Sequence, residues 1–358
     1  MGAATRPAGA QPEPSRPNRP TWLIVAFVCL VTAIVYLCVS ISEGLRRGET
    51  SLPAVLEVAP EVNSAPVAEA AEAPKPEAAS TTEATTAAAA PLPAQMAPGR
   101  SVAIGSEELL AAIVVGAGEG AEHLSVSVRR ISDGRTASLN GDFQWYAASL
   151  FKLAVLYEVE RQIFEGNLTY DQRVTIAEED YAEDLGTVGH LDIDDDGTIA
   201  VEDLLRPMIE ISDNVSAVAL LHLVGSSQVD ATLRSLGIET MTVNRVELWT
   251  TSDDVSRLVE AIYMAEGLGA TERDHMRNLL RAQTIRGGIP GALGAEIAEG
   301  LSVGNKTGTW DGAQHDVAFI EAQNGTYVIA ILTDGTYEGW QAMHGVSQKV
   351  HATMLALP

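Results

Sequence analysis

The first hydrophobic run of the chain is long enough to cross a membrane. Residues 22–41 read WLIVAFVCLVTAIVYLCVSI and contain no charged side chain. About twenty such residues span the roughly 30 Å hydrocarbon core of a bilayer as a helix, whereas a signal peptide has a shorter apolar core of about 7–15 residues. The pattern predicts one transmembrane anchor over residues 21–41. Cleavage near Ser40 or Ser42, as in a signal peptide, is the alternative.

The charges on either side of this run predict its orientation. Three arginines lie in the short tail of residues 1–20, and Arg46 and Arg47 follow the run. This slight excess favours a cytoplasmic N-terminus in the cell membrane, with the rest of the chain on the extracellular or periplasmic side. No cysteine follows Cys38, so the exported part has no disulfide and depends on its hydrophobic core.

Hydrophobic periodicity is lost over residues 42–100. This segment consists mainly of Ala, Pro, Glu, Ser and Thr and has no aromatic residue. Such a composition buries too little apolar surface to offset the entropy of ordering, so a disordered linker is predicted here.

Periodic patterns return in residues 101–358, the predicted catalytic domain. Ser106 is a suitable cap for a helix in which Leu109 and Ile113 recur at helical spacing. The next predicted elements are strands 124–128 and 136–139, a helix from 149, helices 201–211 and 217–224, strands 316–321 and 327–332, and a closing helix 340–355. This order predicts an α+β fold, in which an antiparallel sheet from both ends of the domain receives an inserted all-helical subdomain.

The charge of the domain excludes some partners. Of the whole chain's 23 basic and 48 acidic residues, most of the excess acid lies in residues 101–358. A strongly acidic surface disfavours nucleic acid and anionic lipid as partners. The charge does not indicate whether the protein is a monomer or an oligomer.

Three short motifs carry the candidate chemistry. In chain order they are Ser149-Leu150-Phe151-Lys152, Ser212-Asp213-Asn214 and Lys306-Thr307-Gly308. Each motif alone is common, but together and in this order they match the S-x-x-K, S-D-N and K-T-G signature of penicillin-recognising serine enzymes.

The segments around these motifs read YAASLFKL, DLLRPMIEISDN and NKTGTWDG. With them, essentially all of residues 101–358 resembles the class A β-lactamase-like serine hydrolases of the penicillin-binding superfamily. The resemblance implies a β-lactamase/transpeptidase-like fold that requires no cofactor. It also implies acylation of Ser149 by a β-lactam or a related amide, followed by hydrolysis of the acyl-enzyme.

The resemblance further implies a role for each motif residue. Lys152 lies three residues after Ser149 on one helical face and can activate its hydroxyl. Ser212 would carry a proton to the leaving nitrogen, Asn214 would bind Lys152, and Lys306 would hold the Ser212 region electrostatically. The substrate would contact Thr307 through its carboxylate, Gly308 through a close backbone approach, and the N–H groups of Thr309 and Ser149 as an oxyanion hole.

The chain departs from the family where the deacylating base is expected. Relatives have Arg-x-Glu in a loop after S-D-N, with Asn four residues after the Glu. Arg245-Val246-Glu247 suits the first part, so Glu247 is the candidate base, but Thr251 stands where Asn is expected. The loop is shorter by about a dozen residues than in the family, which puts in doubt the geometry that a general base needs.

A second departure follows K-T-G. Many relatives have a guanidinium there that binds the substrate carboxylate, but this chain reads Gln314-His315-Asp316. His315 is predicted to replace that group in part, because an imidazole loses its charge near neutral pH.

An acidic loop suggests a structural calcium site. Asp192, Asp194, Asp196 and Asp203 fall at the spacing of a calcium loop, with Asp203 in place of the usual glutamate. The alternative is a polar turn whose acidic residues stabilise the start of a helix.

Other catalytic classes lack their motifs. The sequence has neither H-E-x-x-H nor G-x-S-x-G, which disfavours a zinc hydrolase and a Ser-His-Asp hydrolase. We expect an exported, membrane-anchored serine hydrolase that opens β-lactams. The alternatives are a cell-wall peptidase or esterase of the same superfamily and a penicillin-binding sensor that is acylated but does not hydrolyse.

Overall fold

The computed structural model of the chain describes residues 106–243 and 248–358. The predicted tail, anchor and linker, and the candidate base Glu247, lie outside the described residues. Within the described ranges, no helix is both long enough and apolar enough to cross a bilayer.

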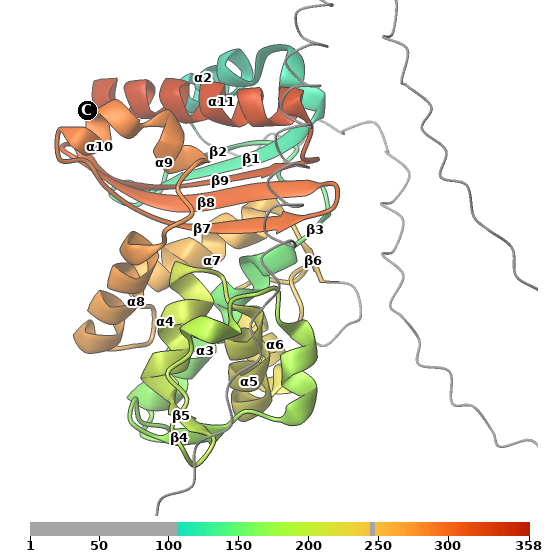
Figure 1. Cartoon of the computed structure of the whole chain (residues 1–358). Coiled ribbons are helices and arrows are strands. Elements are labelled where there is room, and N and C mark those ends of the chain that lie inside the picture. Colours follow the sequence, from blue (N-terminus) through green and yellow to red (C-terminus); the bar gives the residue numbers. More distant parts are fainter. Residues whose placement is uncertain (1–105, 244–247) are drawn as a thin grey trace, which may run out of the picture. The chain divides into compact units, whose positions relative to one another are not determined.

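A five-stranded antiparallel sheet forms the centre of the domain, with the strand order β2-β1-β9-β8-β7 (Figure 1). Two of its strands come from the start of the domain and three from its end, as the sequence predicts. Asn324-Gly325 makes the predicted hairpin, in which Ala322 pairs with Gly325. The strands are β1 (Leu124–Arg130), β2 (Thr136–Leu139), β7 (Ser302–Trp310), β8 (Ala313–Ala322) and β9 (Gly325–Thr333).

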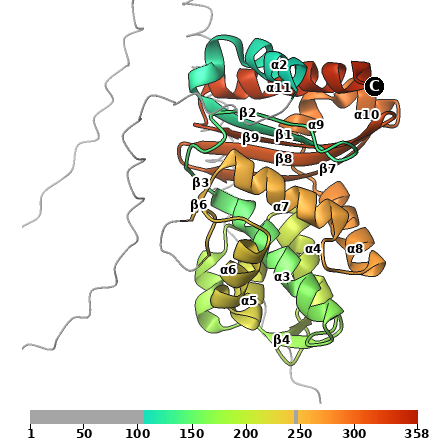
Figure 2. The same ribbon diagram turned by 180° about the vertical axis from the view of Figure 1, so that it is seen from behind.

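One face of this sheet is covered by α2 (Glu107–Ala117) and α11 (Tyr337–Ala356), which lie side by side in both ribbon views (Figures 1 and 2). Ser106 caps α2 by accepting a hydrogen bond from the N–H of Leu109. The two helices touch through glycines, since a Cβ added at Gly345 would lie 2.3 Å from the carbonyl oxygen of Gly116. The turn η1 (Gly118–Glu122) and the short helices α9 (Ile289–Ala292) and α10 (Gly294–Ala298) belong to the same layer.

The other face packs on the inserted helical subdomain, which lies below the sheet in Figure 1. A large apolar cluster joins these helices to the side chains of Val317 and Phe319 on β8. The helices are α3 (Lys152–Phe164), α4 (Val201–Glu210), α5 (Asn214–Val224), α6 (Ser226–Ser235), α7 (Ser252–Met264) and α8 (Ala270–Ala282).

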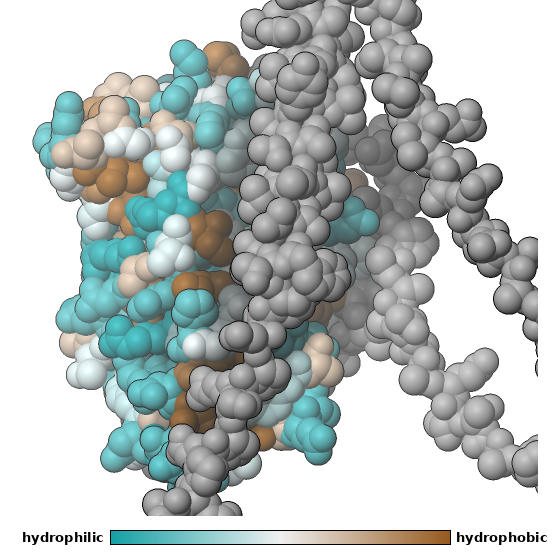
Figure 3. Space-filling view, viewed as in Figure 1, coloured by the Kyte–Doolittle hydropathy of each residue, from teal (hydrophilic) through white to brown (hydrophobic). Residues whose placement is uncertain are grey.

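Short elements complete the domain, and one of them contains Ser149. β3 (Trp145–Tyr146) pairs with β6 (Trp249–Thr250), and β4 (Arg173–Thr175) pairs with β5 (Thr198–Ala200). The 3₁₀ turns are η2 (Ala148–Phe151), η3 (Glu178–Glu183) and η4 (Val188–His190). Hydrophilic residues dominate the visible coloured face of the domain, and hydrophobic residues form small separate patches on it (Figure 3).

Candidate active site

Ser149 lies in the turn η2, directly before α3. Ala148 has a φ of +45°, a conformation that costs a non-glycine residue energy and is often found at functional sites. The Ser149 side chain is half-buried. Because η2 leads directly into α3, Ser149 lies at the start of a helix, where the backbone N–H groups favour negative charge.

Lys152 is fully buried on the first turn of α3. Its Nζ donates to the carbonyl oxygen of Ser212 at 2.6 Å and to Oδ1 of Asn214 at 2.6 Å. Burial lowers the pKa of Lys152 to about 7, although the negative charge of Asp213 acts in the opposite direction. A lysine with such a pKa is partly neutral at neutral pH, and a neutral amine can accept a proton.

The S-D-N turn is held in a strained conformation. Ser212 has a φ of +62°, and Asp213 caps α5 by accepting a hydrogen bond from the N–H of Ser216 at 2.6 Å. The second carboxylate oxygen of Asp213 accepts from the hydroxyl of Thr187. These bonds fix the Ser212 carbonyl and Asn214 against Lys152.

Lys306 approaches the same hydroxyl from the sheet. Its Nζ donates to Oγ of Ser212 at 2.9 Å and to the carbonyl oxygen of Thr307 at 2.8 Å, while Nζ of Lys152 lies 3.3 Å from that Oγ. Lys306 is fully buried. Burial and then the charge of Lys152 lower its pKa well below the usual range, and Asp316 opposes this shift. The Ser212 hydroxyl thus lies between two amines and can relay a proton.

The strand β7 runs close to the Ser149 turn. A Cβ added at Gly308 would lie 2.9 Å from the carbonyl oxygen of Ala147 and 3.0 Å from Cγ of Leu150, so this position requires glycine. Thr307 is buried and Thr309 is exposed. The close approach brings the backbone around Thr309 beside the turn that contains Ser149.

Arg286 is held against the strand that contains K-T-G. Its guanidinium donates to Oδ1 of Asn305 at 3.4 Å and to the carbonyl oxygen of Val303 at 3.1 Å, which places it next to the K-T-G strand. Asn305 also donates to Oδ1 of Asp316 at 2.9 Å. Asn305 and Lys306 lie on opposite faces of β7, so these bonds stabilise the strand from the face away from Ser212.

The prediction for His315 is wrong. The side chain is 1% exposed, and its Nδ1 accepts from the N–H of Thr333 while its Nε2 donates to the carbonyl oxygen of Tyr146 at 2.9 Å. Burial lowers the pKa of His315 to about 4. The ring is therefore a neutral core group that packs against Trp145, and it cannot offer a charge to a substrate carboxylate.

The calcium prediction also needs correction. Among the described residues, no group of three or more His, Cys, Asp or Glu side chains is placed to hold a metal ion. Asp194 forms an ion pair with Arg173, and Asp196 accepts from the backbone and hydroxyl of Thr198. The loop is thus a polar turn before β5, and Asp203 lies in the acidic first turn of α4. Asp192 is not part of any such group.

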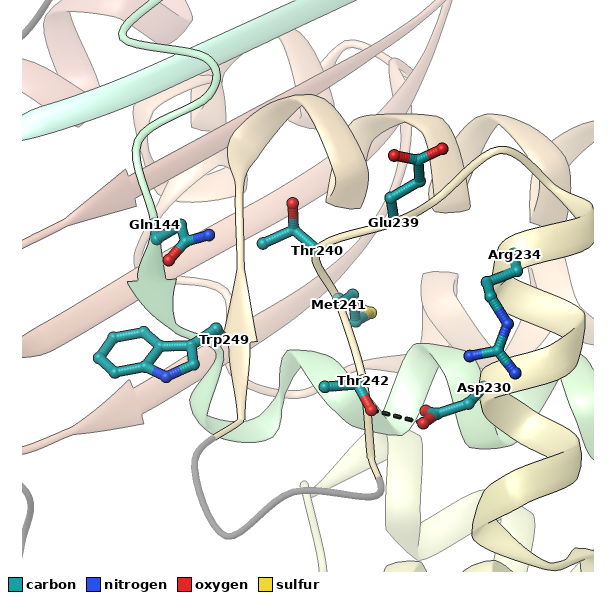
Figure 4. Close-up of a pocket in the computed structure, with 8 residues that line it drawn as sticks. All are labelled: Gln144, Asp230, Arg234, Glu239, Thr240, Met241, Thr242 and Trp249. Carbon is teal, nitrogen blue, oxygen red and sulfur yellow. Dashed lines mark hydrogen bonds between the residues drawn. The ribbon is translucent and has the colours of Figure 1, made fainter.

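A polar cavity of about 520 Å³ lies beside the β3–β6 pair (Figure 4). Gln144 and Trp249 line one side of it, and Arg234 and Glu239 lie toward the other. Asp230, also in its lining, accepts a hydrogen bond from Thr242. No residue of the three motifs lines this cavity, so it is separate from the convergence of the two lysines.

Comparisons with known proteins agree with the fold. A family model described as the β-lactamase enzyme family matches residues 106–354. The fold and this match place the chain in the β-lactamase-like superfamily of serine enzymes. It belongs to the β-lactamase enzyme family.

Individual relatives are distant. The chain is similar to β-lactamase CTX-M-4 of Salmonella typhimurium, with 29% identity over 36% of this chain and 48% of that protein. It is also similar to β-lactamase CTX-M-97 of Escherichia coli, with 25% identity over 56% of this chain and 72% of that protein. The match to CTX-M-4 therefore spans about half of that relative's length.

A solved structure gives a longer match. A β-lactamase from Sphaerobacter thermophilus superposes with a TM-score of 0.62 and 27% identity, over 71% of this chain and 99% of that chain. The similarity thus extends over nearly all of a known β-lactamase structure.

Proposed function

We propose that this protein is an exported, membrane-anchored serine hydrolase that opens β-lactam rings through acylation of Ser149. The observation that carries the proposal is the convergence of Lys152 and Lys306 on the hydroxyl of Ser212, next to the turn that contains Ser149. A buried lysine with a pKa of about 7 is the base that a serine nucleophile needs.

In the acylation step, neutral Lys152 takes the proton from Oγ of Ser149. This oxygen attacks the lactam carbonyl, and the N–H groups of Ser149 and Thr309 stabilise the resulting oxyanion. The C–N bond then breaks, and the proton passes through Ser212, between the two lysines, to the leaving nitrogen. Lys306 keeps the Ser212 hydroxyl in place. Asn214 holds Lys152 and the substrate amide in position.

In the second step, water hydrolyses the ester on Ser149, with Glu247 as the proposed general base. Water loses a proton to Glu247 and adds to the ester carbonyl, and Ser149 regains a proton as it leaves. A carboxylate on the substrate is bound by Thr307.

The proposal also covers the cellular location. The uncharged run of residues 22–41 supports a single membrane anchor with a cytoplasmic N-terminus. Residues 42–100 then serve as a tether for the catalytic domain on the extracellular or periplasmic side. Cell fractionation with protease treatment of intact cells tests this: the domain should stay with the membrane and be digested from outside.

The test of the chemistry uses purified residues 101–358 and a chromogenic cephalosporin. We expect turnover, its loss in Ser149→Ala, and accumulation of a covalent adduct in Glu247→Gln. An adduct that persists without turnover in the native protein would instead indicate the penicillin-binding sensor. Turnover of peptide or ester substrates alone would indicate the cell-wall peptidase or esterase. Absence of both adduct and turnover would refute acylation by β-lactams.

A further inference from the structure

Two aromatic side chains flank the turn that contains Ser149. Tyr146 lies on β3, three residues before Ser149, and Trp310 ends β7, directly after Thr309. Their ring centroids are 6.4 Å apart and the rings are tilted by 50°. Trp310 is 50% exposed, whereas Tyr146 is half-buried. A large aromatic surface beside the candidate nucleophile is therefore open to solvent.

The geometry of β7 places Trp310 on the same face as the site. Residues two apart on a strand share a face, so Trp310 is on the face of Gly308 and Lys306. Gly308 contacts the turn before Ser149, and Lys306 reaches Ser212. β7 is also an edge strand, so a substituent on an acyl group at Ser149 can extend along its outer edge toward Trp310.

Both rings have rigid backbone support. The carbonyl oxygen of Tyr146 accepts a hydrogen bond from buried His315, and Tyr146 pairs with Trp249 across the β3–β6 ladder. Trp310 pairs with Ala313 at the end of the β7–β8 hairpin. The two rings are thus preorganised, and a ligand that stacks on them does not have to order a loop.

Two carboxylates lie near this pair. Glu183 is exposed and close enough to Tyr146 that, after burial, its charge contributes to raising the tyrosine pKa. Asp311 is exposed and directly follows Trp310. An aromatic face attracts cations, and nearby carboxylates strengthen that attraction while they repel anions.

We infer that Tyr146 and Trp310 form the binding platform for the side chain of the acyl donor. Glu183 and Asp311 make this platform prefer an aromatic side chain that carries an ammonium group over one that carries a carboxylate. The inference rests on the proposed acylation of Ser149 and adds the class of acyl donor to it.

Three penicillins provide a matched test, because they share a phenylacetyl-type side chain and differ in one substituent on it. Benzylpenicillin has hydrogen, ampicillin an ammonium group and carbenicillin a carboxylate at that carbon. We measure the second-order rate constant for acylation of the native protein by each compound. Ampicillin should react fastest and carbenicillin slowest, with a ratio of about tenfold or more at low salt that shrinks at high ionic strength.

Variants separate the aromatic and the charge contributions. Trp310→Ala should slow all three penicillins by about threefold to tenfold, while Trp310→Phe retains most of the rate and shows that the site is intact. The double variant Glu183→Gln and Asp311→Asn should reduce the ampicillin-to-carbenicillin ratio to about twofold or less. Matched controls far from the site are Phe164→Ala, at the end of α3 away from Ser149, and Glu299→Gln, both at exposed positions, and neither should change the rates.

The outcomes are distinguishable. If all three compounds acylate Ser149 at similar rates, or if Trp310→Ala behaves like Phe164→Ala, the platform is refuted while the proposed function stands. If none of the three compounds forms an adduct with the native protein, the proposed function itself fails.

Discussion

The acylation rate should follow the protonation of Lys152, and the structure gives the size of the effect. Burial moves the pKa of Lys152 from 10.5 to about 7. At pH 7 about half of the molecules then have the neutral amine, compared with about 1 in 3,000 for an ordinary lysine. At pH 5 the neutral fraction is about 1%. Because the neutral amine is the base, acylation should rise about fiftyfold from pH 5 to pH 7 and only about twofold above it.

The measurement is rapid-quench mass spectrometry of the acyl-enzyme between pH 5 and pH 10. Asp213→Asn keeps the helix cap but removes a negative charge that raises the pKa of Lys152, so this variant should move the rise to lower pH. Asp316 is a necessary control, because burial raises its pKa to about 7 as well. Asp316→Asn should leave the position of the rise unchanged. A rate that increases tenfold per pH unit up to pH 10, or one that does not change with pH, would refute Lys152 as the base.

Other predictions concern stability. His275 contacts Glu160 and Glu202 at 2.6 Å and 2.9 Å. Burial disfavours its charge, but these carboxylates outweigh burial and raise its pKa from 6.5 to about 9. Its contribution, at most about 3 kcal/mol, should be complete below pH 6.5 and be lost as the pH rises through 9. The free energies of urea unfolding of the native protein and of His275→Asn should therefore converge as the pH rises from 6.5 to 9, and a difference that stays constant over this range would contradict the prediction. Gly345→Ala should lower stability by about 1–3 kcal/mol through the clash with Gly116, whereas Gly294→Ala, with open space around it, should not. Neither calcium nor a chelator should shift the melting temperature.

The fold could be predicted because its signals are local. Ser106 before a helical pattern, and Asn324-Gly325 between two alternating runs, each predict an element from a few neighbouring residues. The three motifs could be placed for the same reason, since each occupies a helix start or a strand. The resemblance then supplied their arrangement, which no local pattern contains.

The features of the site that could not be predicted depend on contacts between residues far apart in the sequence. Arg286 is 19 residues before Asn305 in sequence, and only the folded loop brings its guanidinium to the strand. For His315 a local signal existed, because strand alternation places it on the same face as Val317 and Phe319, which are core residues. Because no arginine follows K-T-G, His315 is predicted to contribute a charge, whereas the alternation of the strand indicates that its side chain is buried.

The groups on the two sides of Ser149 define the substrate more narrowly than the motifs do. Thr307 lies on the Lys306 strand, where a substrate carboxylate is proposed to bind. Glu183 and Asp311 provide anions near the aromatic pair, where the acyl side chain is proposed to lie. A domain with such an excess of acidic residues repels a simple anion from a distance. A substrate with one carboxylate therefore binds weakly unless it also carries a positive group. The arrangement therefore favours acyl donors with a carboxylate at one end and an amine at the other, as in a peptide with a free amino group or a penicillin with an ammonium side chain.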